Sequence, residues 1–489
     1  MVALSQDTLA RCAGRLPVPR YDRRKAVAGV VHLGVGGFHR AHQAMYQDRL
    51  MNAGMALDWA ICGVGVLPAD RSMQAVLTAQ DCLYTLVLKH PDGRQDARVI
   101  GAITEYRLAP GDPEAVVERM ADPAIRIVSL TITEGGYHVD AETGALDADH
   151  PDLAPELERG GPPRSAHGLV VEALRRRRER GVPPFTVMSC DNLQGNGGVA
   201  RAAFTGFAAV RDPGLAEWIG EAVSFPNAMV DRITPTTQER DREELERRFG
   251  VQDGWPVVAE PFVQWVLEDR FTAGRPPYEH AGVQLVADVA PYELMKMRLL
   301  NGSHQAMAYF GRLAGMGTVH EAATDPLVGA FLRAFMAAEV APTLRPVPGL
   351  DVDEYQHTLL DRFSNPHVGD TLERICAWTS DRIPKFVLPV IRERLAAGQE
   401  VRRGAAVIAT WARYAEGADD AGRDLDVVDA RRDRLTARAR RWEADPLAFL
   451  RDGELFGDLA DDPRFTTPYA ETLTSLHERG ARATLPALA

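Results

Sequence analysis

The sequence has 489 residues and a mass of 53.6 kDa, with 68 acidic residues against 56 lysines and arginines, which gives a formal charge of −12. This length predicts two or three domains with ample core, and the acidic balance argues against a nucleic-acid-binding protein, because phosphate contacts need a basic surface. No apolar run approaches the ~20 residues that span a bilayer, and the N-terminal segment lacks the apolar stretch of a signal peptide. We therefore expect a cytoplasmic protein that binds neither nucleic acid nor membranes.

The first half of the chain alternates short apolar runs with segments of helical spacing, such as Gly168–Arg180. Runs that are apolar at nearly every residue are typical of parallel strands buried on both faces. The alternation therefore predicts a parallel sheet covered by helices. The candidate strands are Gly29–Leu33, Trp59–Val64, Ile125–Thr133 and Phe185–Cys190.

From about Pro291 the strand-like runs stop, and long segments rich in Ala, Leu, Met and Arg follow. These residue types favour helices. The chain therefore divides near residue 285 into an α/β domain over residues 1–285 and a mainly α-helical domain over residues 286–489. No internal repeat is visible in the sequence.

The run Arg175–Arg178 lies at the end of a predicted helix. A basic run of this kind binds phosphate or nucleic acid in some proteins, but cations also complement the C-terminal dipole of a helix. Given the net charge, we interpret the run as the solvated end of a helix.

Cysteine spacing and metal motifs exclude several kinds of site. No two cysteines form a C-x-x-C pair, so neither a structural zinc nor a thioredoxin-like site is expected. His320-Glu321 begins like H-E-x-x-H, but Thr324 occupies the second histidine position. We expect no catalytic metal and interpret the cysteines as small buried hydrophobic residues: they are Cys12, Cys62, Cys82, Cys190 and Cys376.

A glycine-rich loop follows the first predicted strand, in VVHLGVGGFHRAH. Gly34 and Gly36 supply a G-x-G that lets the backbone approach a pyrophosphate at a helix N-terminus, and Gly37 and Phe38 continue this expected cofactor-binding loop. His39 stands where a third glycine is usual, so the fingerprint is incomplete.

An acidic residue follows the second predicted strand. Asp70 can accept the ribose hydroxyls of NAD and repel the 2′-phosphate of NADP, although Arg71 beside it weakens that exclusion. We expect NAD as cofactor, with NADP as the alternative. The structural alternative for Asp70 is a carboxylate that caps the following loop.

The segment Tyr292–His304 carries polar residues on a predicted helix. At 100° per residue, Lys296, Asn301 and His304 fall within an arc of about 140°. A partly desolvated lysine can act as a general base near neutral pH, and amide and imidazole donors can stabilise an alkoxide-like oxygen. The alternative is a surface lysine with satisfied core polar residues. The apolar residues of the segment are expected to pack elsewhere: Leu294, Met297, Leu300 and Met307.

Tyr292 and Lys296 also form Y-x-x-x-K, the active-site spacing of short-chain dehydrogenases. The glycine loop lacks that family's T-G-x-x-x-G-x-G. The sequence separation between the loop and the Y-x-x-x-K element is also more than twice that in the family. We interpret the match as incidental.

Eight segments between about Gly29 and the C-terminal helices carry a more specific likeness: GVGGFHRAHQA, SLTITEGGY, SCDNLQGNGG, SFPNAMVDRITP, EPFVQWVLEDRF, YELMKMRLLNGSH, DRFSNPHVGDTLERICAW and PKFVLP. In these segments the chain resembles the polyol-specific long-chain dehydrogenase (mannitol dehydrogenase) family. The likeness covers nearly the whole chain, and its K-x-x-x-x-N-x-x-H element is highly specific.

The resemblance implies a metal-independent, nicotinamide-linked enzyme with an N-terminal Rossmann-type domain and a helical C-terminal domain. The implied reaction is oxidation of D-mannitol to D-fructose, and its reverse, by hydride transfer at C2. It implies Lys296 as general base, Asn192 and Asn301 as holders of the reacting oxygen, and His304 as an orienting group. It also implies proton exchange with solvent at Glu134.

The resemblance further implies contacts to the substrate hydroxyls. It places Asp231 and Arg374 around these hydroxyls, together with Arg382, which stands where the family can carry a lysine. Arg382 keeps the charge but changes the geometry, because guanidinium and ammonium groups bind differently.

Other activities remain open at this point. Within the family they are reduction of a hexuronate (fructuronate or tagaturonate), oxidation of D-arabinitol and oxidation of a hexitol phosphate. Outside it, the chain could be an inactive NAD-binding sensor. Arg374 and Arg382 could also accept a substrate carboxylate. The sequence does not define an oligomeric state, and a monomer is compatible with it.

Overall fold

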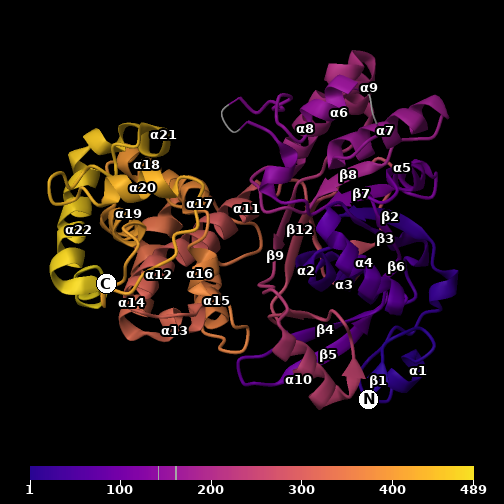
Figure 1. The fold of residues 1–489 in the computed structure, drawn as a ribbon, viewed down its shortest axis with the longest axis horizontal. Coiled ribbons are helices and arrows are strands. Elements are labelled where there is room, and N and C mark those ends of the chain that lie inside the picture. The colour runs from indigo at the N-terminus through magenta and orange to yellow at the C-terminus, as the bar shows by residue number, and fades with distance from the viewer. Residues whose placement is uncertain (141–142, 160–161) are drawn as a thin grey trace. The chain divides into compact units, whose positions relative to one another are not determined.

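The computed structural model describes residues 1–140, 143–159 and 162–489. The chain separates into two compact units, Met1–Ala290 and Pro291–Ala489. Figure 1 draws the first unit from indigo through magenta and the second mainly in orange and yellow. Each unit is described by itself below.

A five-stranded parallel sheet forms the centre of the first unit, with strand order β6-β3-β2-β7-β8. The chain runs outward from β2 through β3 to β6, and then returns to place β7 and β8 on the other side of β2, so the neighbours β2 and β7 mark a topological switch point. Four of the strands are buried at every residue, as expected for a sheet covered on both faces. The bounds are β2 (Ala28–Leu33), β3 (Ala60–Gly65), β6 (Ile103–Leu108), β7 (Ile127–Leu130) and β8 (Thr186–Ser189).

The four predicted strands correspond to β2, β3, β7 and β8, but the predicted bounds of β7 were wrong at both ends. Ile125 closes a turn by donating its N–H to the Asp122 carbonyl oxygen at 3.0 Å. Beyond Leu130 the chain enters a loop, in which Thr133 has a φ of 66°. Both ends are apolar or β-branched, so their composition alone does not separate strand from loop.

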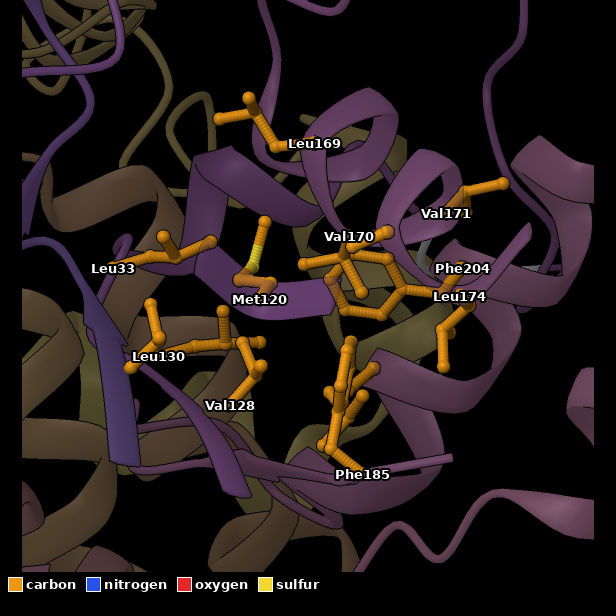
Figure 2. Packing of buried hydrophobic residues seen from close by; sticks show 14 of the residues in the cluster. Leu33, Met120, Val128, Leu130, Leu169, Val170, Val171, Leu174, Phe185 and Phe204 are labelled. Carbon is orange, nitrogen blue, oxygen red and sulfur yellow. The ribbon is translucent and has the colours of Figure 1, made fainter. Parts of the chain in front are cut away.

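Helices cover both faces of this sheet. Alternate strand residues point to opposite faces, so Val31 and Leu33 of β2 pack against α5 (Pro113–Ala121), α7 (Ala166–Glu179) and α8 (Asn196–Arg211). Figure 2 shows this core, with Met120, Val170 and Phe204 converging on the strands. Val30 points the other way, towards α3 (Gln43–Asn52) and α4 (Arg71–Ala79).

Smaller sheets complete the first unit. They are β1 (Val2–Ala3) with β10 (Val251–Gln252); β11 (Val257–Ala259) with β4 (Tyr84–Lys89) and β5 (Gln95–Ile100); and β13 (Gln284–Val286) with β12 (Gln264–Glu268) and β9 (Ala228–Asp231). The sequence analysis did not anticipate these strands. The remaining helices are α1 (Leu9–Cys12), α2 (Gly37–Ala41), α6 (Ala154–Arg159), α9 (Pro213–Ala222) and α10 (Glu239–Phe249).

The basic run at the end of α7 is not simply solvated, which corrects the expectation for its third residue. The Arg177 side chain is buried and donates hydrogen bonds to the carbonyl oxygens of Met120, Asp122, Ile125 and Pro183. Burial lowers the pKa of its guanidinium to about 10. Arg177 therefore ties the end of α7 to the loop that leads into β7.

The second unit is helical, and residues 291–489, all of which the structure describes, contain no strand. Its central helix α12 contacts α19, where Tyr309 and Tyr414 place their ring centroids 5.5 Å apart. The helices are α11 (Ala290–Lys296), α12 (Gly302–Leu313), α13 (Val319–Thr324), α14 (Pro326–Phe335), α15 (Val352–Phe363), α16 (Leu372–Ile375), α17 (Thr379–Phe386), α18 (Leu388–Ala396), α19 (Arg402–Ala415), α20 (Arg432–Ala439), α21 (Gly453–Phe456) and α22 (Pro463–Thr484).

The expected fold class is confirmed: a parallel-sheet α/β unit is followed by a mainly α-helical one. All five cysteines are buried, as the sequence predicted. Among the described residues, no helix combines the length and apolar character that crossing a membrane requires.

Candidate active site

The glycine loop continues directly from β2. Gly34 has a φ of 91°, and a Cβ at this position would clash with the backbone of Thr131, so only glycine fits. The Gly34 N–H donates to the Val64 carbonyl oxygen at 2.9 Å, and the Gly36 N–H donates to the Gly34 carbonyl oxygen at 2.8 Å. The loop is thus held tightly at the carboxyl end of the sheet, beside the switch point.

A cavity of about 320 Å³ opens beside this loop, entirely within the first unit. Gly36, Gly37, Phe38 and Asp70 line it, whereas Gly34 shapes the loop behind it. Crevices outside the carboxyl ends of parallel strands are where such folds bind dinucleotides. The remaining wall comes from Val35, Arg40, Ala69, Ser72, Met73, residues 234–237 and Trp255.

Sequence reasoning missed the wall formed by residues 234–237 and Trp255. These residues lie about two hundred positions beyond the glycine loop, and no spacing links them to it. Tertiary structure brings them there: Gly37 approaches Thr234 and Val257, and the buried Arg40 guanidinium donates to the Trp255 carbonyl oxygen. Arg40 also places a cation beside the expected pyrophosphate position.

Asp70 has the loop-capping role, which was one of the two that the sequence left open. Its Oδ2 atom accepts the N–H groups of Val66 and Leu67 at 2.8 and 2.9 Å, so it fixes the loop after β3. The same residue lines the cavity. A carboxylate held by two backbone donors is well placed to receive ribose hydroxyls with little further ordering.

His39, in the place of the third glycine, turns inward. Its ring stacks on His32 of β2, with ring centroids 3.4 Å apart, and both rings are buried. Burial lowers the pKa of His32 to about 3 and that of His39 well below its usual value, so both are neutral. A stacked pair of neutral imidazoles therefore fills the space where a glycine would allow close helix–strand packing.

The predicted proton-exchange residue, Glu134, begins the short helical turn Glu134–Tyr137 after β7. Asp191 holds this turn: its carboxylate accepts the N–H groups of Ile132 and Thr133 at 3.1 and 2.9 Å and the Tyr137 hydroxyl at 2.7 Å. Burial raises the pKa of Asp191 to about 6. Sequence reasoning missed Asp191, although it directly precedes the predicted Asn192.

Asn192 and Asp231 also lie at strand ends of the first unit. Asn192 follows β8 by three residues, and Asp231 is the buried last residue of β9, paired with Gln264. The buried Asn196 side chain links these segments, because its amide donates to the carbonyl oxygens of Asp191 and Ala228 at 3.0 and 2.7 Å. A single network therefore holds the segments that carry two expected site residues.

In the second unit, the expected regular helix around Lys296 is wrong. A π-helical turn over Met297–Asn301 separates α11 from α12. Because i and i+5 are paired in a π-helix, Asn301 follows Lys296 one turn later on the same face, and the 100° spacing does not apply. Short π segments inside helices occur frequently at functional sites.

The polar side chains in and beside this turn are buried. The exposed fraction is 7% for Lys296 and 6% for His304, whose ring centroid lies 4.5 Å from that of Phe363. The Asn301 Oδ1 atom is buried and has no hydrogen-bond partner among the residues that the structure describes. An unpaired buried amide oxygen is costly, so this atom is suited to a ligand hydroxyl.

The Tyr292 hydroxyl has a partner outside the Y-x-x-x-K element. Its hydroxyl donates to the Pro348 carbonyl oxygen at 2.7 Å. This contact anchors α11 to a loop of its own unit.

The two predicted substrate-binding arginines lie side by side in the second unit. Arg374 pairs with Asp370 through Nε and Nη2, at 2.7 and 2.6 Å. Arg382 donates to the carbonyl oxygens of Arg374 and Ile375 at 3.1 and 2.9 Å, which caps α16. The bidentate face of Arg374 is therefore already used by a carboxylate of the protein.

The sheet order, the glycine loop and the cavity define a protein of the Rossmann-type dinucleotide-binding class with an additional helical unit. Family models described as the mannitol dehydrogenase Rossmann domain and the mannitol dehydrogenase C-terminal domain match residues 28–280 and 288–477. The chain belongs to the mannitol dehydrogenase family.

Full-length relatives agree with this assignment. The chain is 47% identical over 486 residues to mannitol 2-dehydrogenase of Aspergillus fumigatus, covering 98% of this chain and 97% of the relative. It is 44% identical over 486 residues to mannitol 2-dehydrogenase of Pyricularia oryzae, covering 98% of this chain and 97% of that relative.

Two solved structures are similar over their whole length. One is the Pseudomonas fluorescens mannitol 2-dehydrogenase ternary complex with NAD and D-mannitol, with a TM-score of 0.92 and 44% identity, covering 100% of this chain and 99% of that one. The other is a substrate-free D-sorbitol dehydrogenase, with a TM-score of 0.90 and 38% identity, covering 99% and 100%.

Proposed function

We propose that this protein catalyses the NAD-dependent oxidation of D-mannitol to D-fructose, and the reverse reduction, by hydride transfer at C2 without a catalytic metal. The observation that carries the proposal is likeness along the entire chain, at 44% identity and a TM-score of 0.92, to an enzyme solved with NAD and D-mannitol. The Aspergillus fumigatus relative at 47% identity is likewise a mannitol 2-dehydrogenase.

The first unit fits the cofactor. Glycine at position 34 lets the loop pass close to the Thr131 backbone, and the adjacent cavity has the backbone of Gly36 and Gly37 on one side and Asp70 on another. Bound NAD would supply the nicotinamide carbon that accepts the hydride. Asp70 favours a free ribose hydroxyl over the 2′-phosphate of NADP.

The general base of the proton chemistry is assigned to the second unit. Lys296 takes the proton from the C2 hydroxyl, while Asn301 and Asn192 donate hydrogen bonds to the oxygen as negative charge develops. The burial of Lys296 supports its role as base. The unpaired Oδ1 atom of Asn301 is an acceptor, so it is suited to a neighbouring hydroxyl of the substrate, while the Nδ2 group is the donor assigned to the reacting oxygen. His304 orients the substrate, and Glu134 exchanges the proton with solvent.

Substrate selection follows from the polar residues around the sugar chain. Asp231, Arg374 and Arg382 are assigned to the remaining hydroxyls. Because Asp370 pairs with the Nε and Nη2 groups of Arg374 and balances its charge, a neutral polyol is favoured over a hexuronate, whose carboxylate would meet a guanidinium that is already paired.

D-Sorbitol is the second candidate substrate, because the likeness to a D-sorbitol dehydrogenase also covers the entire chain. The two hexitols differ in configuration at C2, so the orientation of the C2 hydroxyl towards Lys296 decides between them. D-Arabinitol, the hexuronates and hexitol phosphates stay as less favoured alternatives.

A substrate panel tests the proposal. NADH oxidation is followed with D-fructose, D-fructuronate and D-tagaturonate, and NAD reduction with D-mannitol, D-sorbitol, D-arabinitol and a hexitol phosphate. We expect the highest kcat/KM with D-fructose and D-mannitol, unchanged by EDTA. Faster turnover of a uronate, or NADH binding without turnover of any substrate, contradicts the proposal; the second result indicates a sensor.

The small-molecule polyol or ketose is the expected partner. A cytoplasmic location stays a prediction, and no oligomeric state is assigned.

A further inference from the structure

Three potential metal ligands gather in the first unit outside the cofactor cavity. His138, His150 and Asp152 each place one ligand atom so that all three atoms lie within 4.8 Å of one another. The Asp152 Oδ2 atom lies 4.0 Å from His138 Nε2 and 3.8 Å from His150 Nδ1. The two imidazole rings have centroids 4.1 Å apart.

Backbone structure holds these residues together despite their separation in sequence. His138 has a left-handed backbone with φ 47° and ψ 41°, which turns the chain sharply after the Glu134–Tyr137 turn. The chain returns through a bridge between Val139 and Leu146 and through the Asp147 N–H, which donates to the His138 carbonyl oxygen at 2.8 Å. The N–H groups of Leu153 and Ala154 then close a turn on the His150 carbonyl oxygen. The cluster is therefore built by the fold.

The donor set suits a transition metal. Two imidazole nitrogens and one carboxylate oxygen are ligands that Zn²⁺ prefers, and a fourth position is left for water. With bonds of about 2.0–2.1 Å, tetrahedral ligands lie about 3.3 Å apart, so side-chain rotations that shorten these separations by roughly 0.5–1.5 Å complete the geometry. Hard cations such as Mg²⁺ prefer all-oxygen sites.

Unused ligand atoms and access also agree with metal binding. Among the described residues, neither ring nitrogen of His138 nor the Asp152 carboxylate forms a hydrogen bond. The Asp152 side chain is 72% exposed and that of His150 is 37% exposed, which leaves an entry path.

An ordinary ion pair explains the cluster less well. At 4.0 and 3.8 Å, the Asp152 oxygen is too far from either ring nitrogen for a hydrogen-bonded ion pair. One existing contact must be replaced on binding, namely the hydrogen bond from the Asp152 N–H to His150 Nδ1 at 3.2 Å.

We propose that His138, His150 and Asp152 form a peripheral, non-catalytic binding site for a divalent transition metal of the zinc type. The site would link His138, which directly follows the Glu134–Tyr137 turn, to His150 and Asp152. His167 connects the turn to the site, because its Nε2 atom hydrogen-bonds the Tyr137 carbonyl oxygen at 3.0 Å and its ring lies 5.7 Å from that of His138. This inference does not depend on the proposed reaction.

Zinc titration of the full chain by calorimetry tests the site, after EDTA treatment and dialysis. We expect one Zn²⁺ per chain, at least tenfold weaker binding in His138→Ala and in Asp152→Asn, and unchanged binding in His357→Ala, whose exposed ring lies on α15. Co²⁺ should give the intense visible absorption of tetrahedral coordination in the wild type and the control only.

Two results would overturn the inference. Unchanged Zn²⁺ affinity in both site variants, each checked for its fold by circular dichroism, would mean adventitious binding to other surface groups. Loss of NAD-linked turnover on EDTA treatment, restored by Zn²⁺ in the wild type but not in Asp152→Asn, would make the site catalytic and contradict its peripheral role.

Discussion

The two units present functional groups in opposite ways. In the first, the cavity assigned to the cofactor is lined largely by segments that follow strands, such as Val35–Gly37 after β2 and Asp70 after β3. In the second, the assigned catalytic groups project from a helix whose regular spacing is broken by a π turn between Lys296 and Asn301. Loops at strand ends can approach a large ligand with many N–H groups, whereas a helix face positions a few side chains firmly. Cofactor binding and proton transfer should therefore be separable by mutation.

Lys296→Ala should give the largest effect. Removing the general base should lower kcat for D-mannitol oxidation near neutral pH roughly 10²–10⁴-fold, the usual contribution of a positioned base, while NADH affinity stays unchanged because the cavity lies in the other unit. Stopped-flow kinetics and NADH fluorescence titration measure the two quantities. Lys385→Ala, which removes a lysine paired with Asp381 on α17, is the control. A loss of kcat below tenfold would contradict the prediction. A loss of NADH affinity as large as the loss of kcat would show that cofactor binding and proton transfer are not separable.

Asp191→Asn tests the network that holds the first unit's strand ends. Burial raises the pKa of Asp191 from 3.8 to about 6 in the folded protein. Because the folded state binds this proton more tightly than the unfolded chain, Asp191 contributes stability that is fully present below about pH 4 and lost as the pH rises through about 6. The advantage of the wild type over the Asn variant should therefore fall by about 3 kcal/mol across this interval.

Urea unfolding at several pH values measures this difference in the free energy of unfolding. Asp92→Asn, which replaces an exposed carboxylate between β4 and β5, should follow the wild type throughout. A constant difference between the wild type and Asp191→Asn would show that Asp191 does not titrate in this interval.

Asp70→Ser should give the smallest effect and should be confined to cofactor choice. Without the carboxylate, repulsion of the 2′-phosphate disappears, and the ratio of kcat/KM for NAD to that for NADP should fall about tenfold. The kcat with saturating NAD should change little, because Lys296 is untouched. Initial rates with both cofactors measure the ratio, and an equal loss with both would indicate that Asp70 acts only by fixing the loop after β3.

The predictability of the site differed between the units for a physical reason. Strand β2 and its glycine loop are encoded locally, because burial on both faces demands a continuous apolar run and Gly34 must adopt a positive φ. The π turn is not encoded in this way. The residue types of the π turn are equally compatible with an ordinary α-helix. The extra residue in this turn depends on how α11 and α12 pack in the second unit.

By itself the sequence determined the α/β-then-helical order, the glycine loop, the family and the candidate polar residues, because each depends on composition or on spacing over a few residues. Tertiary structure alone decided which distant segments complete the cavity, that Asp191 holds the Glu134 turn, that Asp370 occupies Arg374, and that His138 meets His150 and Asp152. These contacts join residues whose meeting depends on how the chain turns between them, and no local pattern records those turns.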